Sequence, residues 1–283
     1  MKKYFSSVLI AVLMIAGLGL ILYPVISDQR NRSEASVLIV EYNDEVKAKT
    51  EAEWNMMLQN AYDYNTRLLE GSIQPDAEGH VEGYSNELDV TGTGIMGYLD
   101  IEKIGVELPI YHGTDNGVLQ IGVGHVEFSS LPVGGPSTHC VLSGHRGLPS
   151  ATLFTDLPEL EIGDEFTVTV LGQVFTYRVD QIETVLPEEV DDLSIVEGKD
   201  YCTLVTCTPY GINSHRLLVR GERVTEQENQ SGVLITNEGI QIEPFVVAVF
   251  MTIIILLGIN IYIALSGNNN NSGKKNSSKK GGK

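Results

Sequence analysis

Two uncharged apolar runs near the ends of the chain restrict its possible folds more than any other feature of the sequence. They extend from Val8 to Ile26 and from Pro244 to Leu265. Each run is long enough to cross a bilayer as a helix, which takes about 20 residues. Residues 28–243, between the two runs, are therefore the part of this sequence that is expected to fold in water.

Lysines on the outer flanks of the two runs predict how the chain is oriented in a membrane. Lys2 and Lys3 precede the first run, and five lysines follow the second. Because cytoplasmic flanks of membrane spans are enriched in Lys and Arg, both termini are predicted to be cytoplasmic and the central part extracellular. The first run is alternatively a cleaved signal peptide, although its apolar stretch is longer than that of a usual signal.

The central part of the chain is strongly acidic. The sequence has 19 Lys and Arg against 37 Asp and Glu, and seven of the lysines lie in the terminal segments. A surface of this charge is repelled by a nucleic-acid backbone and by anionic lipid headgroups. The composition therefore argues against nucleic acid as a partner.

A series of short apolar, β-branched runs begins near Ile95 and predicts a mainly β domain. Gly, Pro and Asp separate the runs, and residues 171–173 (LGQ) have the composition of a hairpin turn. Seven or more short strands with turn signals are typical of a β-barrel or a β-sandwich. The runs are 96–101, 106–111, 140–143, 165–171, 174–185, 201–207 and 217–224.

A helical segment and a long loop precede the β region. Apolar residues recur with a period near 3.6 from Asp44 onward, which predicts a helix capped by Asn43 or Asp44 and ended by Gly71. A shorter helical piece is expected over residues 33–40. Residues 71–93 show no period, and a loop of this length is often either a functional lid or disordered.

Of the three cysteines, Cys207 has the context of a reactive thiol. It ends an apolar run just before Thr208-Pro209, and the strand ends of a rigid sheet are good positions for reactive groups. A buried structural thiol is the alternative for Cys207, and it is our interpretation of Cys140 and Cys202. Cys202 and Cys207 are poor disulfide partners, because residues five apart on a strand point to opposite faces.

Two further residues are candidates to act with Cys207. His145 follows a β run and lies between Gly144 and Gly147, and glycines allow close backbone approach and tight turns. Arg216 opens the β run that follows the cysteine. Its cation would lower the thiol pKa, hold a carbonyl oxygen, or form only a surface ion pair. No CxxC or His-rich spacing indicates a metal site.

The sequence around these candidates resembles the signatures of a known enzyme family. Residues 203–207 (TLVTC), followed by Arg216, resemble the TLxTC and Arg signature of sortases, and residues 142–149 (LSGHRGLP) resemble their histidine segment. The resemblance covers about residues 43–222. Segments similar to class C sortases, the pilin polymerases, are 108–113, 122–125, 129–135 and the continuation CTPYGIN at 207–213.

This resemblance implies a fold, a reaction and a role for each candidate. The fold would be mainly β, an eight-stranded sortase-type β-barrel with N-terminal helices and a lid loop, flanked by transmembrane helices. Cys207 would be the nucleophile, His145 the general acid and base, and Arg216 the stabiliser of the oxyanion or substrate carbonyl. The enzyme would cleave an LPXTG-like sorting signal between Thr and Gly, form a thioacyl enzyme, and join it to a lysine of a second pilin subunit. No metal or organic cofactor is needed.

The resemblance and the apolar runs together divide the chain into six predicted segments in a cell-membrane protein whose catalytic domain is extracellular. The segments are 1–27 (cytoplasmic start and first span or signal), 28–93 (helical segment and lid loop), 94–225 (catalytic β-barrel), 226–243 (linker), 244–265 (second span) and 266–283 (basic cytoplasmic tail).

The lid is where the sequence departs from the family. Lids of class C sortases resemble one another in carrying Asp-Pro followed by an aromatic residue, whereas the nearest match here is Pro75-Asp76-Ala77. Asp76 is therefore the lid candidate, with Arg216 as its possible partner. The missing aromatic ring predicts a looser lid over Cys207.

Three other functions remain open on the sequence alone. A sortase that anchors surface proteins to the cell wall would use a peptidoglycan amine in place of the pilin lysine. A thiol protease would resolve the acyl enzyme with water. A non-enzymatic, membrane-tethered surface domain would contain Cys207 only as a buried structural residue.

Overall fold

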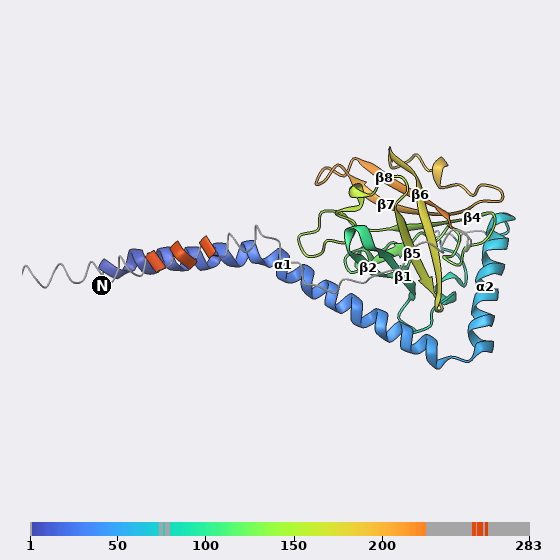
Figure 1. Cartoon of the computed structure of the whole chain (residues 1–283), viewed down its shortest axis with the longest axis horizontal. Coiled ribbons are helices and arrows are strands. Elements are labelled where there is room, and N and C mark those ends of the chain that lie inside the picture. The colour runs from blue at the N-terminus through green and yellow to red at the C-terminus, as the bar shows by residue number, and fades with distance from the viewer. Residues whose placement is uncertain are drawn as a thin grey trace, which may run out of the picture. The chain divides into compact units, whose positions relative to one another are not determined.

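The computed structural model describes residues 2–73, 76, 80–224 and seven residues between Met251 and Ile259. The chain divides into two compact units, and the unit that contains the candidate site consists of residues 27–232. In this unit the strands lie between Ile95 and Arg223, and helical segments precede them in the chain (Figure 1).

Eight strands form a closed barrel in the part of the chain that the structure describes, in the order β1-β2-β3-β4-β7-β8-β6-β5. The pairs β2–β3 and β4–β7 are parallel, and the other neighbours are antiparallel. This confirms the predicted mainly β, eight-stranded barrel. The strands are β1 (Ile95–Ile101), β2 (Val106–His112), β3 (Val123–His125), β4 (Thr138–Ser143), β5 (Glu165–Val170), β6 (Gln173–Val185), β7 (Asp200–Thr208) and β8 (His215–Arg223).

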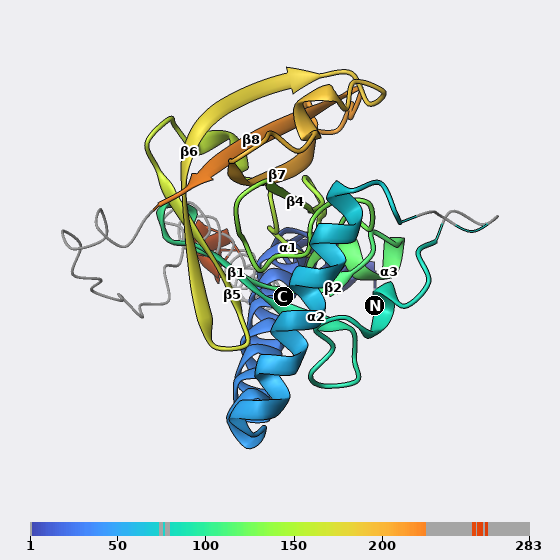
Figure 2. The ribbon, with the colours of Figure 1, turned by 90° about the vertical axis from the view of Figure 1, so that its right-hand side faces the viewer.

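Each predicted β run corresponds to one strand, and the hairpin turn is where the sequence indicates it. Leu171 and Gly172 join β5 to β6 with φ values of 49° and 76°, and two positive φ values are typical of a type I′ turn. β6 then runs beside β8 (Figure 2). The sequence missed β3, because its three residues are all buried and show no alternation.

The predicted boundaries of the helical region were wrong at its start. Helix α1 extends over Lys2–Ala48 and includes residues 33–40, and α2 begins only at Glu51 and ends at Leu69. Thr50 caps α2 in a capping box with Glu53, which satisfies free backbone N–H groups at both positions. The predicted end is correct, because Gly71 follows the C-cap with a φ of 68°.

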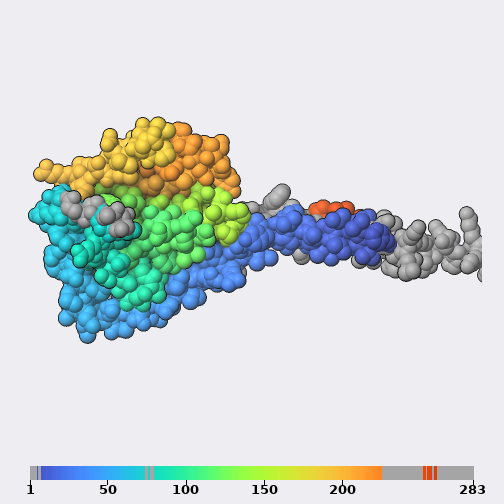
Figure 3. Space-filling model, turned by 180° about the vertical axis from the view of Figure 1, so that it is seen from behind, coloured from blue at the N-terminus to red at the C-terminus, as the bar shows by residue number. Residues whose placement is uncertain are grey.

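Both long helices pack against the barrel through buried tyrosines. The Tyr42 hydroxyl of α1 donates to the carbonyl oxygen of Met96 (3.0 Å) and accepts from the amide of Leu171 (2.8 Å). The Tyr64 hydroxyl of α2 donates to the carbonyl oxygen of Glu127 (2.9 Å). Burial raises the pKa of both tyrosines. Figure 3 shows the light blue to cyan residues of α2 and of the end of α1 packed against the residues coloured green to orange.

The remaining helical elements among residues 80–224 are short and lie in connections between strands or before β1. One of them, over 191–193, lies in the long connection between β6 and β7. They are α3 (Asn116–Leu119) and four 3-10 turns, Tyr84–Asn86, Glu102–Ile104, Leu157–Glu159 and Asp191–Leu193.

The first apolar run lies within α1, which contains a segment long and apolar enough to cross a membrane. The predicted second span, 244–265, falls largely outside the described residues. The predicted linker, 226–243, and the basic tail, 266–283, lie outside them entirely.

Candidate active site

The hairpin of β7 and β8 places Cys207 and Arg216 directly opposite each other. Side chains that face each other across paired strands lie on the same face of a sheet. That face is the outer one here, since Cys202, five positions earlier on β7, is fully buried while Cys207 is half-buried. The thiol and the guanidinium therefore lie together on the outer side of one end of the barrel.

The parallel pair β4–β7 brings the segment that carries His145 towards the same end of β7. Its register joins each residue of β4 to the residue 62 positions later, from Thr138 with Asp200 to Ser143 with Val205. The alignment continues beyond the end of β4, because the Thr206 hydroxyl donates to the carbonyl oxygen of Gly144 (2.8 Å) with the same offset. His145 is the next residue along, and its counterpart in this alignment is Cys207.

Arg146 extends the alignment by one more residue. Its Nη1 atom donates to the hydroxyl of Thr208 (3.2 Å), again with an offset of 62, and its Nε atom donates to the carbonyl oxygen of Thr155 (3.2 Å). Bonds from the residues on either side of His145 therefore reach the residues on either side of Cys207. Sequence reasoning missed this role of Arg146, although the residue directly follows His145.

The segment that carries His145 turns back on itself. The amide of Phe154 donates to the carbonyl oxygen of His145 (3.0 Å), and the amide of Gly147 donates to the hydroxyl of Thr155 (3.2 Å). Gly144 is required for this close packing, because a Cβ atom there would lie 2.6 Å from the ring of Phe154. The glycine next to the histidine thus lets the backbone approach an aromatic side chain, as its position in the sequence indicates.

The same segment rests on α1. The Asp28 carboxylate accepts from the amide of Thr152 (2.5 Å) and from the Nε atom of Arg32 (2.8 Å). Arg32 in turn donates to the carbonyl oxygen of Gly105 (3.1 Å), between β1 and β2. The helix turn that follows the first apolar run therefore supports the segment that contains His145.

The guanidinium of Arg216 is held by backbone groups of its own hairpin. Its Nη1 atom donates to the carbonyl oxygens of Asn213 (3.3 Å) and His215 (3.1 Å). Arginine has five N–H donors in a rigid fork, so donors remain for an oxygen placed near Cys207. No ion pair among the described residues includes Arg216, which disfavours the alternative of a surface ion pair.

The loop 71–93 is attached to the barrel through Glu127. The Glu127 carboxylate accepts from the amide of Val81 (2.6 Å) and contacts Nδ1 of His80 (3.2 Å). The hydrogen bond and charge of Glu127 raise the pKa of His80. The Asp76 carboxylate accepts from the amide of His80 (2.8 Å), within the same loop. Pro75 and Ala77 lie outside the described residues, and a contact of Asp76 with Arg216 stays a prediction.

The structure thus combines a closed β-barrel with a cysteine and an arginine that face each other at one end of the barrel, near a segment that carries a histidine. The model of the sortase domain matches residues 99–224. Sortase A of Streptococcus agalactiae is 30% identical over 71% of this chain and 77% of its own length. Sortase D of Bacillus subtilis is 36% identical over 46% of this chain, which spans 64% of that protein. The chain belongs to the sortase family, whose members are cysteine transpeptidases.

Solved structures of class C sortases are similar to this fold. Sortase C1 from Streptococcus agalactiae is 50% identical, with a TM-score of 0.63 over 66% of this chain and 98% of that one. Sortase C from Clostridium perfringens, solved with the C-terminal cell wall sorting motif, is 41% identical, with a TM-score of 0.60 over 68% of this chain and 100% of that one. The resemblance to class C sortases is thereby confirmed.

Proposed function

We propose that this chain is a pilin-polymerising cysteine transpeptidase of class C, with Cys207, His145 and Arg216 as its catalytic residues. The observation that carries the proposal is the pairing of Cys207 with Arg216 across β7 and β8. The β4–β7 register supports it, because its offset of 62 residues, continued two residues beyond Ser143, would align His145 with Cys207. Likeness to class C structures at 40–50% identity supports the assignment to this class.

In the proposed reaction, Cys207 attacks the carbonyl carbon between Thr and Gly of an LPXTG-like signal. Arg216 lies opposite the cysteine, where its free N–H donors would stabilise the oxyanion of the tetrahedral intermediate. His145 would donate a proton to the departing glycine amine, so that the peptide bond breaks and a thioacyl enzyme remains. A lysine amine of a second pilin subunit would then attack the thioester carbonyl and lose a proton to His145. The C–S bond would break, the Cys207 thiolate would leave, and an isopeptide bond would remain.

The competing enzymatic functions differ in the acceptor, not in the first half of the reaction. A sortase that anchors proteins to the cell wall would pass the acyl group to a peptidoglycan amine, and a thiol protease would pass it to water. The class C likeness favours the lysine acceptor. The membrane topology with an extracellular barrel is part of the same proposal, and the apolar segment of α1 supports it.

The test uses the detergent-solubilised full chain with an LPXTG-type peptide, a lysine-bearing acceptor peptide and a glycine-based acceptor that mimics a wall bridge. We expect an acyl adduct on Cys207 by mass spectrometry and, with the lysine acceptor, a branched peptide. Cys207→Ala should abolish the adduct, whereas Cys202→Val, which changes a buried thiol on the same strand, should retain it. An adduct on another residue, or none at all, would contradict the proposed roles, and transfer only to glycine or water would contradict pilin polymerisation.

The lid assignment is also part of the proposal. Asp76 would lie in a loop that covers Cys207, and the absence of an aromatic residue after it would make the cover loose. Thiol labelling of Cys207 in the full chain should then change little when Asp76 is replaced by Ala. A large acceleration of labelling would instead indicate a tight lid held by this carboxylate.

A further inference from the structure

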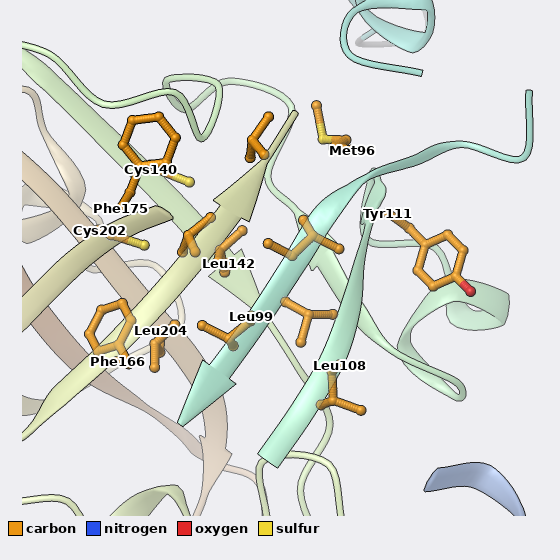
Figure 4. Packing of buried hydrophobic residues seen from close by; sticks show 14 of the residues in the cluster. Met96, Leu99, Leu108, Tyr111, Cys140, Leu142, Phe166, Phe175, Cys202 and Leu204 are labelled. Carbon is orange, nitrogen blue, oxygen red and sulfur yellow. The ribbon is translucent and has the colours of Figure 1, made fainter. Parts of the chain in front are cut away.

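The two other cysteines form a pair inside the barrel. Cys140 on β4 and Cys202 on β7 are direct partners in the parallel register, and both are almost completely buried, at 3% and 0% exposed. Figure 4 shows both sulfur atoms pointing into the same part of the core, near Phe166 and Phe175. Both thiols are free. Two thiols that face each other across neighbouring strands are therefore available to react with each other.

A buried histidine makes the two thiols unequal. His125 on β3 is fully buried and is held by the hydroxyl of Tyr84 (2.8 Å) and the carbonyl oxygen of Ser130 (2.9 Å). Burial acts to raise the pKa of Cys140, but the interactions of its thiol with Cys202 and His125 outweigh burial and lower this pKa. Burial and the neighbouring Cys140 raise the pKa of Cys202. Cys140 is therefore the thiol of the pair that ionises more readily.

The backbone distance between the two cysteines is compatible with a disulfide. Neighbouring strands lie about 4.7–4.9 Å apart, and Cα atoms bridged by a disulfide are usually about 4.4–6.8 Å apart. A dithiol reductant of sufficiently negative potential would cleave such a bond by thiol–disulfide exchange.

We propose that Cys140 and Cys202 are a redox-sensitive thiol pair that peroxide converts to a disulfide within the folded barrel. The sulfur of Cys140 attacks one oxygen of hydrogen peroxide, which breaks the O–O bond, gives a sulfenic acid and releases water. The sulfur of Cys202 then attacks the sulfenic sulfur, the S–O bond breaks, and a second water leaves. Peroxide gains the two electrons that the two thiols lose, and a dithiol reductant reverses the step.

The position of the pair links this chemistry to the strands of the active site. Cys140 precedes His145 by five residues, and Cys202 precedes Cys207 by the same number. A disulfide would therefore join β4 to β7 covalently, five residues before His145 on one segment and five residues before Cys207 on the other. The pair does not depend on the proposed transpeptidase reaction, since neither of its thiols lies on the outer face that carries Cys207.

The test compares three forms of the detergent-solubilised full chain after exposure to hydrogen peroxide and removal of the excess. Cys207→Ala isolates the buried pair, Cys207→Ala with Cys202→Val breaks it, and the unchanged protein reports whether peroxide oxidises Cys207 under the same conditions. Each sample is denatured with a maleimide, without reductant, and its mass and proteolytic peptides are measured. Far-ultraviolet circular dichroism before denaturation verifies that each form is folded.

For Cys207→Ala we expect maleimide labels to fall from two to none, the mass to fall by two hydrogen atoms, and one peptide to link Cys140 with Cys202. A dithiol should restore both labels. In the variant that also carries Cys202→Val, no such link can form and Cys140 should retain its label or bear oxygen. The proposal is overturned if both labels persist in Cys207→Ala at a peroxide dose that oxidises Cys207 fully. It is also overturned if Cys140 becomes a sulfinic acid without a link, or if the link forms only after denaturation.

Discussion

Removal of the Arg146 side-chain bridge should impair turnover more than folding. Arg146→Met keeps much of the aliphatic stem but removes the bonds to the Thr208 hydroxyl and the Thr155 carbonyl oxygen, both 3.2 Å long. A hydrogen bond to a charged group contributes about 1.5–3 kcal/mol, and the partial exposure of Arg146 favours the lower end of this range. Loss of both bonds should therefore reduce the free energy of unfolding by about 2–3 kcal/mol, allowing for that exposure.

The effect on the reaction follows from the position of the bridge next to His145 and Cys207. A misplacement of about 1 Å can lower a rate about 100-fold, so we expect kcat/KM for peptide transfer to fall roughly 10- to 100-fold, mainly through kcat. The assay is transfer of an LPXTG-type peptide to an amine, measured at a temperature where circular dichroism shows the variant fully folded.

A double-mutant cycle separates this bridge from a general loss of packing. Thr208→Val removes only the acceptor of the bond to Nη1, and it should lower kcat/KM less than Arg146→Met. The double variant should be no slower than Arg146→Met alone, because the two single changes break one shared contact. Additive losses, or a folded Arg146→Met protein within twofold of the unchanged enzyme, would refute the idea that the bridge positions His145 against Cys207.

Three further outcomes follow from the contacts. Gly144→Ala should lower the free energy of unfolding by about 1–3 kcal/mol, since its Cβ would meet the Phe154 ring at 2.6 Å; an unchanged midpoint in urea would contradict this. Tyr42→Phe leaves two buried backbone groups unpaired and should cost about 1–3 kcal/mol by the same measurement. Because Glu127 raises the pKa of His80, their contact should be present in acid and weaken as pH rises through that pKa. The amides of the loop 71–93 should then exchange faster above it, corrected for intrinsic rates, but not in His80→Gln.

The sequence predicted most of the barrel because its signals are local. Alternating and β-branched runs marked seven strands, and a Leu-Gly pair marked the hairpin turn between β5 and β6. A local signal for the start of α2 is also present in the sequence, because Thr50 and Glu53 have the spacing of a capping box. The prediction followed the apolar period, which continues across this boundary, and did not use this cap. β3 gave no signal, because three buried residues are too few to show a period.

The candidate site was predicted as a set of residue types, whereas its arrangement depends on contacts that are distant in the sequence. Cys207 and Arg216 flank a short loop, so their approach follows from a hairpin. His145 approaches Cys207 only if β4 pairs in parallel with β7. The sequence of neither strand predicts that the other is its neighbour in the sheet. The roles of Arg146 and of the pair Cys140–Cys202 were missed for the same reason.

One register accounts for both thiol environments on β7. The offset of 62 residues puts Cys202 beside Cys140 in the core, and strand alternation then puts Cys207 on the outer face beside the segment of His145. A slip of one residue would exchange the two faces of the strand, so that the outer thiol would be buried and the inner one exposed. Burial of the apolar face of β7 is therefore enough to select the register. That register alone places one thiol of β7 in the core beside Cys140 and the other on the outer face, and no additional structural element is needed.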